Sequence, residues 1–263
     1  CAVRLFLGFL GLLPFFIYFE LNEIKKINFN LKKVFFFTLI LGSIFGMANI
    51  LQQVSLLYTD IANSAVFTVL YVVIVPLISY FIFSIKIHPS IWPSVTLCLI
   101  GGLLLSEIKN YDVRFGDMLV IIGAFFWAFH IIFIYKVLKI FNFPIAIATF
   151  QCLVAGIFCS FPALAFETVT INLISKEITE LLYAGILSSG VAFMLQAYAQ
   201  RVLSPASVAI IFSLEGVFAS IFGWILLDQF LSEIKVFGIM IILLAVIFSQ
   251  LIPIYGKKNY GRI

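Results

Sequence analysis

Charged residues are scarce in this sequence: Asp, Glu, Lys and Arg make up 11% of its 263 residues, against about 25% in an ordinary soluble domain. Hydrophobic residues make up 63%. A soluble globule of this length cannot bury so large an apolar fraction, so lipid must surround much of the chain. The composition therefore argues against a soluble enzyme, a nucleic-acid-binding protein and a disordered regulator.

Motifs for metal, nucleotide or nucleophilic chemistry are also missing from the sequence. It contains no Walker A motif, no GxGxxG after a strand, no HExxH and no GxSxG. The cysteines show neither a CxxC pair nor metal-ligand spacing, and they are Cys1, Cys98, Cys152 and Cys159. We therefore expect no cofactor, no metal site and no ATP-driven transport.

Long apolar runs fill most of the chain. A membrane-spanning helix needs about 20 apolar residues, because the hydrocarbon core is about 30 Å thick and the helix rises about 1.5 Å per residue. The runs are continuously apolar and do not alternate, which excludes the strands of a membrane barrel. The sequence predicts nine spanning helices, at about 1–19, 34–57, 61–84, 91–107, 117–138, 145–166, 178–199, 206–227 and 235–254.

Basic residues gather on one side of this predicted bundle. Of the 16 Lys and Arg residues, 11 fall on one side and the other 5 on the opposite side. Loops rich in Lys and Arg stay in the cytoplasm. We therefore expect a multi-pass protein of a bacterial cytoplasmic membrane, with a cytoplasmic C-terminus. The 11 residues are Lys25, Lys26, Lys32, Lys33, Lys86, Lys136, Lys139, Arg201, Lys257, Lys258 and Arg262; the 5 are Arg4, Lys109, Arg114, Lys176 and Lys235.

The sequence repeats itself weakly at an offset of 144 residues. Between residues 41–73 and 185–217 eight positions are identical without a gap, among them Gln52 and Gln196. Five spans separate each predicted helix from its counterpart, and an odd number reverses the direction, so the two copies must be inverted. Inverted repeats are typical of secondary transporters, whose substrate site lies between the halves near the bilayer midplane.

The repeat divides the chain into two domains and a tail. Residues 1–107 form the first repeat with four helices, residues 117–254 the second with five, and residues 255–263 a basic cytoplasmic tail. Two equal repeats would contain ten helices, and we expect the helix that is missing to be the first. The predicted fold is therefore an all-α, polytopic membrane bundle of two inverted five-helix repeats.

Several short motifs follow one another along the chain. They are ANSAVFT at 62–68 with LYVVIVP at 70–76, Gly116-Asp117 with AFFWA at 124–128, SPAS at 204–207 with SLE at 213–215, and the run that starts at Arg4-Leu5. In this order they resemble the drug/metabolite transporter superfamily with EamA-type domains. The resemblance implies ten helices in two inverted repeats and the export or uptake of small metabolites. The family usually has Pro after the Glu at position 215, where this sequence has Gly216.

Glu215 is the only acidic residue deep within a predicted span. A charge at the bilayer centre costs roughly 2.5–3.5 kcal/mol on insertion scales, so such a side chain normally faces a cavity or a partner. Glu215 could contact a substrate amine or carry a proton; alternatively it is a structural residue that bonds a neighbouring helix. Tyr71 occupies the equivalent position in the first repeat and is a candidate cavity wall, with simple packing as the alternative.

Three amides are further candidates. Gln52 and Gln196 hold equivalent places in the two repeats, and Asn49 lies three residues before Gln52 on the same helical face. They could line a central cavity, or they could join neighbouring helices by hydrogen bonds.

Trp127 and His130 are spaced to share a helical face. His130 could relay a proton and Trp127 could form a cavity wall; alternatively, both pack in the bundle. The glycine pairs Gly42/Gly46 and Gly101/Gly102 predict close approaches between helices.

The function predicted from these residues is secondary transport of a small organic metabolite, such as an amino acid, an amine or a carboxylate, by alternating access. The expected partners are this small molecule and the lipid bilayer, with proton coupling open and no nucleic acid. One alternative is a membrane scaffold or sensor that transports nothing. Another is an intramembrane enzyme, which would need a nucleophile with its base.

Overall fold

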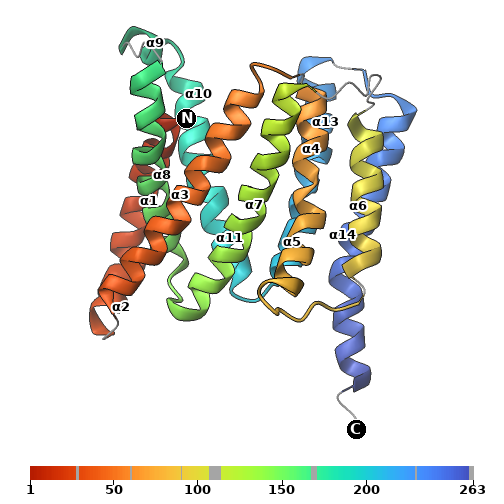
Figure 1. Cartoon of the computed structure of the whole chain (residues 1–263), viewed down its shortest axis with the longest axis horizontal. Coiled ribbons are helices and arrows are strands. Elements are labelled where there is room, and N and C mark those ends of the chain that lie inside the picture. The colour runs from red at the N-terminus through yellow and green to blue at the C-terminus, as the bar shows by residue number, and fades with distance from the viewer. Residues whose placement is uncertain are drawn as a thin grey trace. The chain divides into compact units, whose positions relative to one another are not determined.

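The computed structural model of the chain describes residues 1–27, 30–59, 61–89, 91–106, 114–166, 171–228 and 230–260. Within these ranges every regular element is helical, as the composition predicts. Residue 107, Lys109 and residues 261–263, which entered the expectations above, lie outside the described residues. In chain order (Figure 1) the elements are α1 (Ala2–Phe15), η1 (Phe16–Glu20), α2 (Leu21–Lys26), α3 (Leu31–Ser55), α4 (Ile61–Val69), α5 (Tyr71–Phe81), α6 (Ile91–Ser106), α7 (Phe115–Ile140), α8 (Pro144–Phe166), α9 (Ile171–Lys176), α10 (Ile178–Leu182), η2 (Tyr183–Val191), α11 (Ala192–Gln200), α12 (Pro205–Phe212), α13 (Leu214–Leu227) and α14 (Glu233–Tyr260).

Seven helical stretches of the described residues are long and apolar enough to cross a membrane. They agree with seven of the nine predicted spans, and they are Ala2–Lys26, Lys32–Ser55, Phe115–Ile140, Pro144–Phe166, Ile178–Gln200, Pro205–Leu226 and Glu233–Leu251. The other two predicted spans are apolar helices of fewer than 18 residues, Phe67–Phe81 and Ile91–Ser106. The protein is therefore a multi-pass membrane protein, whereas the count of nine spans remains a prediction.

The first span is longer than the sequence suggested. The helical stretch predicted to end at residue 19 continues to Lys26, because α1, η1 and α2 follow one another without a break. The η1 segment is a turn of π-helix, in which the N–H bonds the carbonyl five residues back; the N–H of Leu21, for example, bonds the carbonyl of Phe16. Glu20, one residue beyond the predicted end of this span, therefore lies inside the helical stretch.

The chain folds into two compact units that do not coincide with the two sequence repeats. Unit 1 consists of Cys1–Gln53 and Ile132–Leu203, and unit 2 consists of Val54–Ile131 and Ser204–Ile263. Each unit therefore combines a segment from the first predicted repeat with one from the second. The long helix α7 contributes its first part to unit 2 and its last part, from Ile132, to unit 1.

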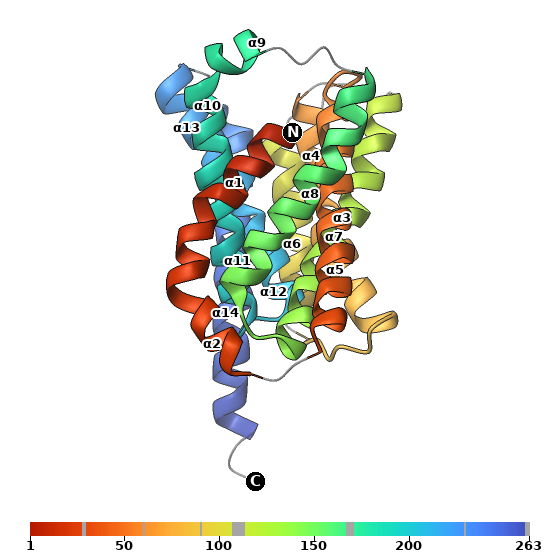
Figure 2. The same cartoon turned by 90° about the vertical axis from the view of Figure 1, so that its left-hand side faces the viewer.

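Close helix approaches hold unit 1 together. Helix α1 packs along α8 and along η2 (Figure 2), and a Cβ on Gly8 would lie 3.0 Å from the carbonyl oxygen of Gly185. Helix α3 packs on α8 in the same way, because a Cβ on Gly42 would overlap the side chain of Val154 and one on Gly46 would lie 2.9 Å from the ring of Phe158. The predicted Gly42/Gly46 approach is therefore confirmed.

Unit 2 has its tightest packing between α6 and α14, which run side by side in Figure 1. A Cβ on Gly101 would lie 2.9 Å from the carbonyl oxygen of Gly238, and one on Gly238 would lie 2.8 Å from that of Gly101. Val217, Ile239 and Ile242 form a buried apolar cluster beside this crossing. The close approach predicted at Gly101 is confirmed, and it depends on a second glycine that the sequence did not single out.

Candidate functional site

Two helical stretches of unit 2 are each distorted at one residue, Leu70 and Ser213, where the backbone N–H bonds the carbonyl three residues back while the backbone angles stay helical. We call these two points helix interruptions; they are 143 positions apart. Helix α4 ends at Val69 and α5 begins at Tyr71, with Leu70 in a turn between them. Helix α12 ends at Phe212 and α13 begins at Leu214, with Ser213 between them. The hydroxyl of Ser213 donates a hydrogen bond to the carbonyl of Ile210 at 2.6 Å, which satisfies part of the interrupted backbone.

Tyr71 directly follows the interruption at Leu70, and Glu215 is the second residue after the one at Ser213. Tyr71 is the first residue of α5, and its side chain is buried. Glu215 lies in the first turn of α13, its side chain is exposed, and it is within electrostatic range of Tyr71. The N-terminal turn of a helix favours a negative charge. The structure thus places the two residues that sequence equivalence paired in one unit and within electrostatic range of each other, and the acidic one has an exposed side chain within a span.

The pair Trp127 and His130 shares one face of α7, as predicted. Their rings meet edge to face, with centroids 5.9 Å apart and an interplanar angle of 82°. His130 is fully buried, and Trp127 is half-buried. This geometry fits a packed aromatic pair, and it leaves the proton-relay and cavity-wall roles as predictions.

The three candidate amides belong to unit 1, not to the unit that holds Glu215. Gln52 is half-buried near the end of α3. Gln196 is buried on α11, and its side-chain N–H donates to Oε1 of Gln200 at 3.2 Å. Among the described residues, the side-chain oxygen of Gln196 has no hydrogen-bond partner. Gln196 therefore retains an open acceptor of the kind that a ligand N–H could use.

Asn49 is engaged in a buried contact that the sequence did not reveal. Its side-chain oxygen accepts a hydrogen bond from the guanidinium of Arg4, and its side-chain N–H donates to the carbonyl of Phe45 at 2.8 Å. Arg4, which we had counted only as a topological charge, is half-buried between α1 and α3. No sequence pattern marks this contact, because its two residues are 45 positions apart.

Two further carboxylates are buried, and both bind backbone N–H groups. Glu20 accepts from the N–H of Ile145 at 3.0 Å and from that of Ala146 at 2.7 Å, in the first turn of α8. Asp117 accepts from the N–H of Arg114 at 2.8 Å and from the hydroxyl of Thr59. Such carboxylates fix helix ends. Of the three carboxylates, only Glu215 has an exposed side chain.

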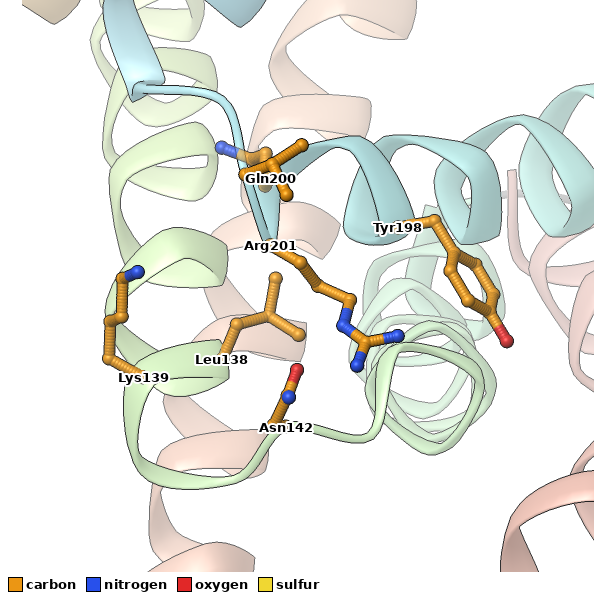
Figure 3. A pocket seen from close by; sticks show the side chains of 7 residues that line it. Leu138, Lys139, Asn142, Tyr198, Gln200 and Arg201 are labelled. Carbon is orange, nitrogen blue, oxygen red and sulfur yellow. The ribbon is translucent and has the colours of Figure 1, made fainter.

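A hollow of about 520 Å³ lies elsewhere in unit 1 (Figure 3). None of the seven residues predicted to contact substrate lines it. It lies where α7 and α11 end, and its lining residues are Leu138, Lys139, Asn142, Tyr198, Gln200, Arg201 and Val202. In the part of the chain that the structure describes, no cluster of three or more His, Cys, Asp or Glu side chains is placed to hold a metal ion.

Comparisons with known proteins agree with this architecture. The model of a family described as "EamA-like transporter family" matches residues 114–251. A relative from Archaeoglobus fulgidus, described as an "Uncharacterized transporter", is 30% identical over 250 residues, which are 95% of this chain and 75% of the relative. A solved crystal structure with 14% identity has a TM-score of 0.78 and covers 95% of this chain and 87% of its own, which is a likeness of fold.

Proposed function

Because this chain belongs to the EamA-like transporter family of the drug/metabolite transporter superfamily, we propose that it is a secondary transporter for a small organic metabolite. The proposed substrates are an amino acid, an amine or a small carboxylate. The proposed mechanism is alternating access by two inverted repeats, residues 1–107 and 117–254. The observation that carries the proposal is the exposed Glu215 side chain within electrostatic range of Tyr71, each within two residues of a helix interruption.

The spacing of Tyr71 and Glu215 supports the repeat. Tyr71 and Glu215 are 144 residues apart, which is the same offset that aligns Gln52 with Gln196. In transporters with inverted repeats, discontinuous helices at corresponding positions of the two halves mark the substrate site. The interruptions at Leu70 and Ser213 are local distortions that lie one position away from this correspondence, and the residues beyond them differ in chemistry: a phenol in one half and a carboxylate in the other.

Glu215 is proposed as the polar contact of the site. An exposed carboxylate in mid-span faces either lipid or a polar space, and the roughly 2.5–3.5 kcal/mol cost of a charge at the bilayer centre favours the polar space. The side chain can bind a substrate ammonium, or it can take up a proton during the transport cycle. Gln52, Gln196 and Asn49 are proposed secondary contacts, with Trp127, Tyr71 and His130 as walls.

The experiment starts with the substrate. Amino acids, amines and small carboxylates are screened one by one for thermal stabilisation of the purified protein, because a ligand that binds the folded state raises the melting midpoint. The stabilising compound is then followed in proteoliposomes, both as uptake driven by a pH gradient and as exchange without a gradient. Wild type is compared with Glu215→Gln and with the control Glu233→Gln, which neutralises an exposed carboxylate at the start of α14.

The two roles of Glu215 predict different results. As a proton carrier, Glu215→Gln retains exchange and loses uptake driven by the gradient; as a substrate contact, it loses both. The control variant keeps both activities. Wild-type uptake and exchange in Glu215→Gln at every pH would refute the role of this side chain, and no transport of any compound by wild type would refute the proposed function.

The proposed orientation has its own test. Eleven of sixteen basic residues fall on the side that we assign to the cytoplasm. A fluorescent protein fused after residue 263 should then be bright in cells, and a periplasmic phosphatase fused at the same place should be inactive. The reverse pattern would invert the orientation.

A further inference from the structure

The hollow at the end of α7 and α11 has the composition of an anion site. Lys139 and Arg201 contribute two positive charges to its lining, and Asn142, Tyr198 and Gln200 add polar groups. In Figure 3 the guanidinium of Arg201 lies between Asn142 and Tyr198, and Lys139 extends on the other side of Leu138. No carboxylate belongs to the lining.

Each of the two cations lies near an aromatic ring. Among the described residues, neither cation forms an ion pair. The Lys139 ammonium lies 5.1 Å from the ring centroid of Tyr135, and the Arg201 guanidinium lies 5.9 Å from that of Tyr198. The carboxylate within electrostatic range of Arg201 is Glu20, but both of its oxygens accept backbone N–H groups of α8. The charges of Lys139 and Arg201 therefore stay available to a ligand, and the planar guanidinium suits the oxygens of a phosphate.

The hollow lies at the basic end of unit 1. The hydrogen bonds of Glu20 bring the end of the first span to the start of α8, next to the turn that carries Asn142. Other cations of this end are Lys25, Lys26, Lys32, Lys33 and Lys136. Of the described acidic residues there, Glu20 is buried and Glu23 pairs with Lys26 at 2.6 Å. Clusters of Lys and Arg at the end of a membrane helix attract anionic lipids.

An exposed apolar stripe runs from the hollow along α11. Leu195 and Tyr198 are three residues apart on one face of α11, and Val202 lies in the turn directly after the helix; their side chains are 58%, 39% and 85% exposed. A soluble anion would make no use of this stripe, whereas the acyl chain of a lipid would cover it. The polar hollow and the apolar stripe together match an amphiphile.

We propose that Asn142 and Arg201 bind the phosphate of an anionic phospholipid headgroup, with Lys139 adding a second positive charge to the hollow and an acyl chain lying along Leu195 and Val202. This site is separate from the substrate site proposed above, and its occupancy does not depend on transport. A lipid bound there stabilises unit 1 by connecting the turn after α7 with the end of α11.

The test measures lipid-dependent stabilisation of the purified protein in detergent. Dioleoyl phosphatidylglycerol and dioleoyl phosphatidylcholine are titrated separately, inorganic phosphate is a third arm, and melting midpoints give apparent affinities. The pocket variant is Lys139→Gln with Arg201→Gln. The matched control is Lys25→Gln with Lys33→Gln, which removes two exposed charges at the same end.

We expect phosphatidylglycerol to stabilise wild type more than phosphatidylcholine does. The pocket variant should bind phosphatidylglycerol roughly 25-fold more weakly, about five-fold for each cation lost, and the control should change by no more than about two-fold. Arg201→Lys, which keeps the charge and folds more readily, should show a weakening of a few-fold. Equal weakening in the pocket and control variants would overturn the proposal in favour of diffuse surface charge. Equal stabilisation by inorganic phosphate alone would overturn it in favour of a soluble anion.

Discussion

The bond between Glu20 and the first turn of α8 leads to a sharp prediction about stability. Each oxygen of the buried Glu20 carboxylate accepts one backbone N–H, from Ile145 at 3.0 Å and from Ala146 at 2.7 Å. Glu20→Gln keeps the size of the side chain but replaces one acceptor oxygen with an NH₂ group. This group then faces a backbone N–H that has no partner within its own helix.

The expected change in the free energy of unfolding combines what the variant loses with what it recovers. A hydrogen bond to a charged group contributes about 1.5–3 kcal/mol, and the charge at the helix N-terminus adds to it. Removing the buried charge recovers part of its desolvation cost. A net loss of about 2 kcal/mol remains, and at ~2–4 °C per kcal/mol for a chain of this size, the melting midpoint should fall by roughly 4–8 °C.

The control is Glu23→Gln. Glu23 pairs with Lys26 at 2.6 Å, but both side chains are exposed, and such pairs contribute at most about 0.5 kcal/mol. Its midpoint should fall by less than about 2 °C, and the difference should vanish in high salt, while the effect at Glu20 persists. Differential scanning fluorimetry in detergent measures the melting midpoints of the two variants. Equal midpoints for the two variants would refute the capping role of Glu20.

Three other expectations concern packing and accessibility. Gly101→Ala should lower the free energy of unfolding by about 1–3 kcal/mol, because its Cβ would lie 2.9 Å from the carbonyl oxygen of Gly238. Gly102→Ala should be tolerated better, because its Cβ would meet only the side chain of Val69, at 3.1 Å or more; equal melting midpoints for the two variants would contradict this. A maleimide should label native protein once, at the exposed Cys1; intact mass would show extra labels if the buried thiols react, and these are Cys98, Cys152 and Cys159. Asn49→Leu should cost about 1–3 kcal/mol by leaving the guanidinium of Arg4 without its acceptor. Adding Arg4→Met should recover part of that loss, and strictly additive effects in the double-mutant cycle would exclude the contact.

Much of the architecture could be predicted from the sequence because lipid imposes simple rules on composition. Apolar runs of about 20 residues gave seven of the nine predicted spans to within a few residues, and the glycine pattern at Gly42/Gly46 marked a real helix approach. The spacing of Trp127 and His130 also placed their rings in contact. Each of these features depends on residues that are close together in the sequence.

The features that the sequence did not predict depend on distant partners. Glu20 follows a run that seemed to end at residue 19, and only the start of α8, 125 residues later, shows why a carboxylate is buried there. The contact between Arg4 and Asn49 joins two helices, and no local pattern specifies it. The sequence also did not predict the helix interruptions at Leu70 and Ser213, since neither position holds proline or glycine.

The division of the chain into interleaved units imposes an order on synthesis. Unit 1 needs both Cys1–Gln53 and Ile132–Leu203, so its first two long helices wait until at least 79 further residues have been made (132 minus 53). At about 5–20 residues per second, this delay is roughly 4–16 s. During this time the faces of α1 and α3 that carry Gly8 and Gly42 have no partner helix, because their neighbours in the folded unit come from residues after 132. Nascent chains arrested before residue 132 should therefore be the species most readily degraded.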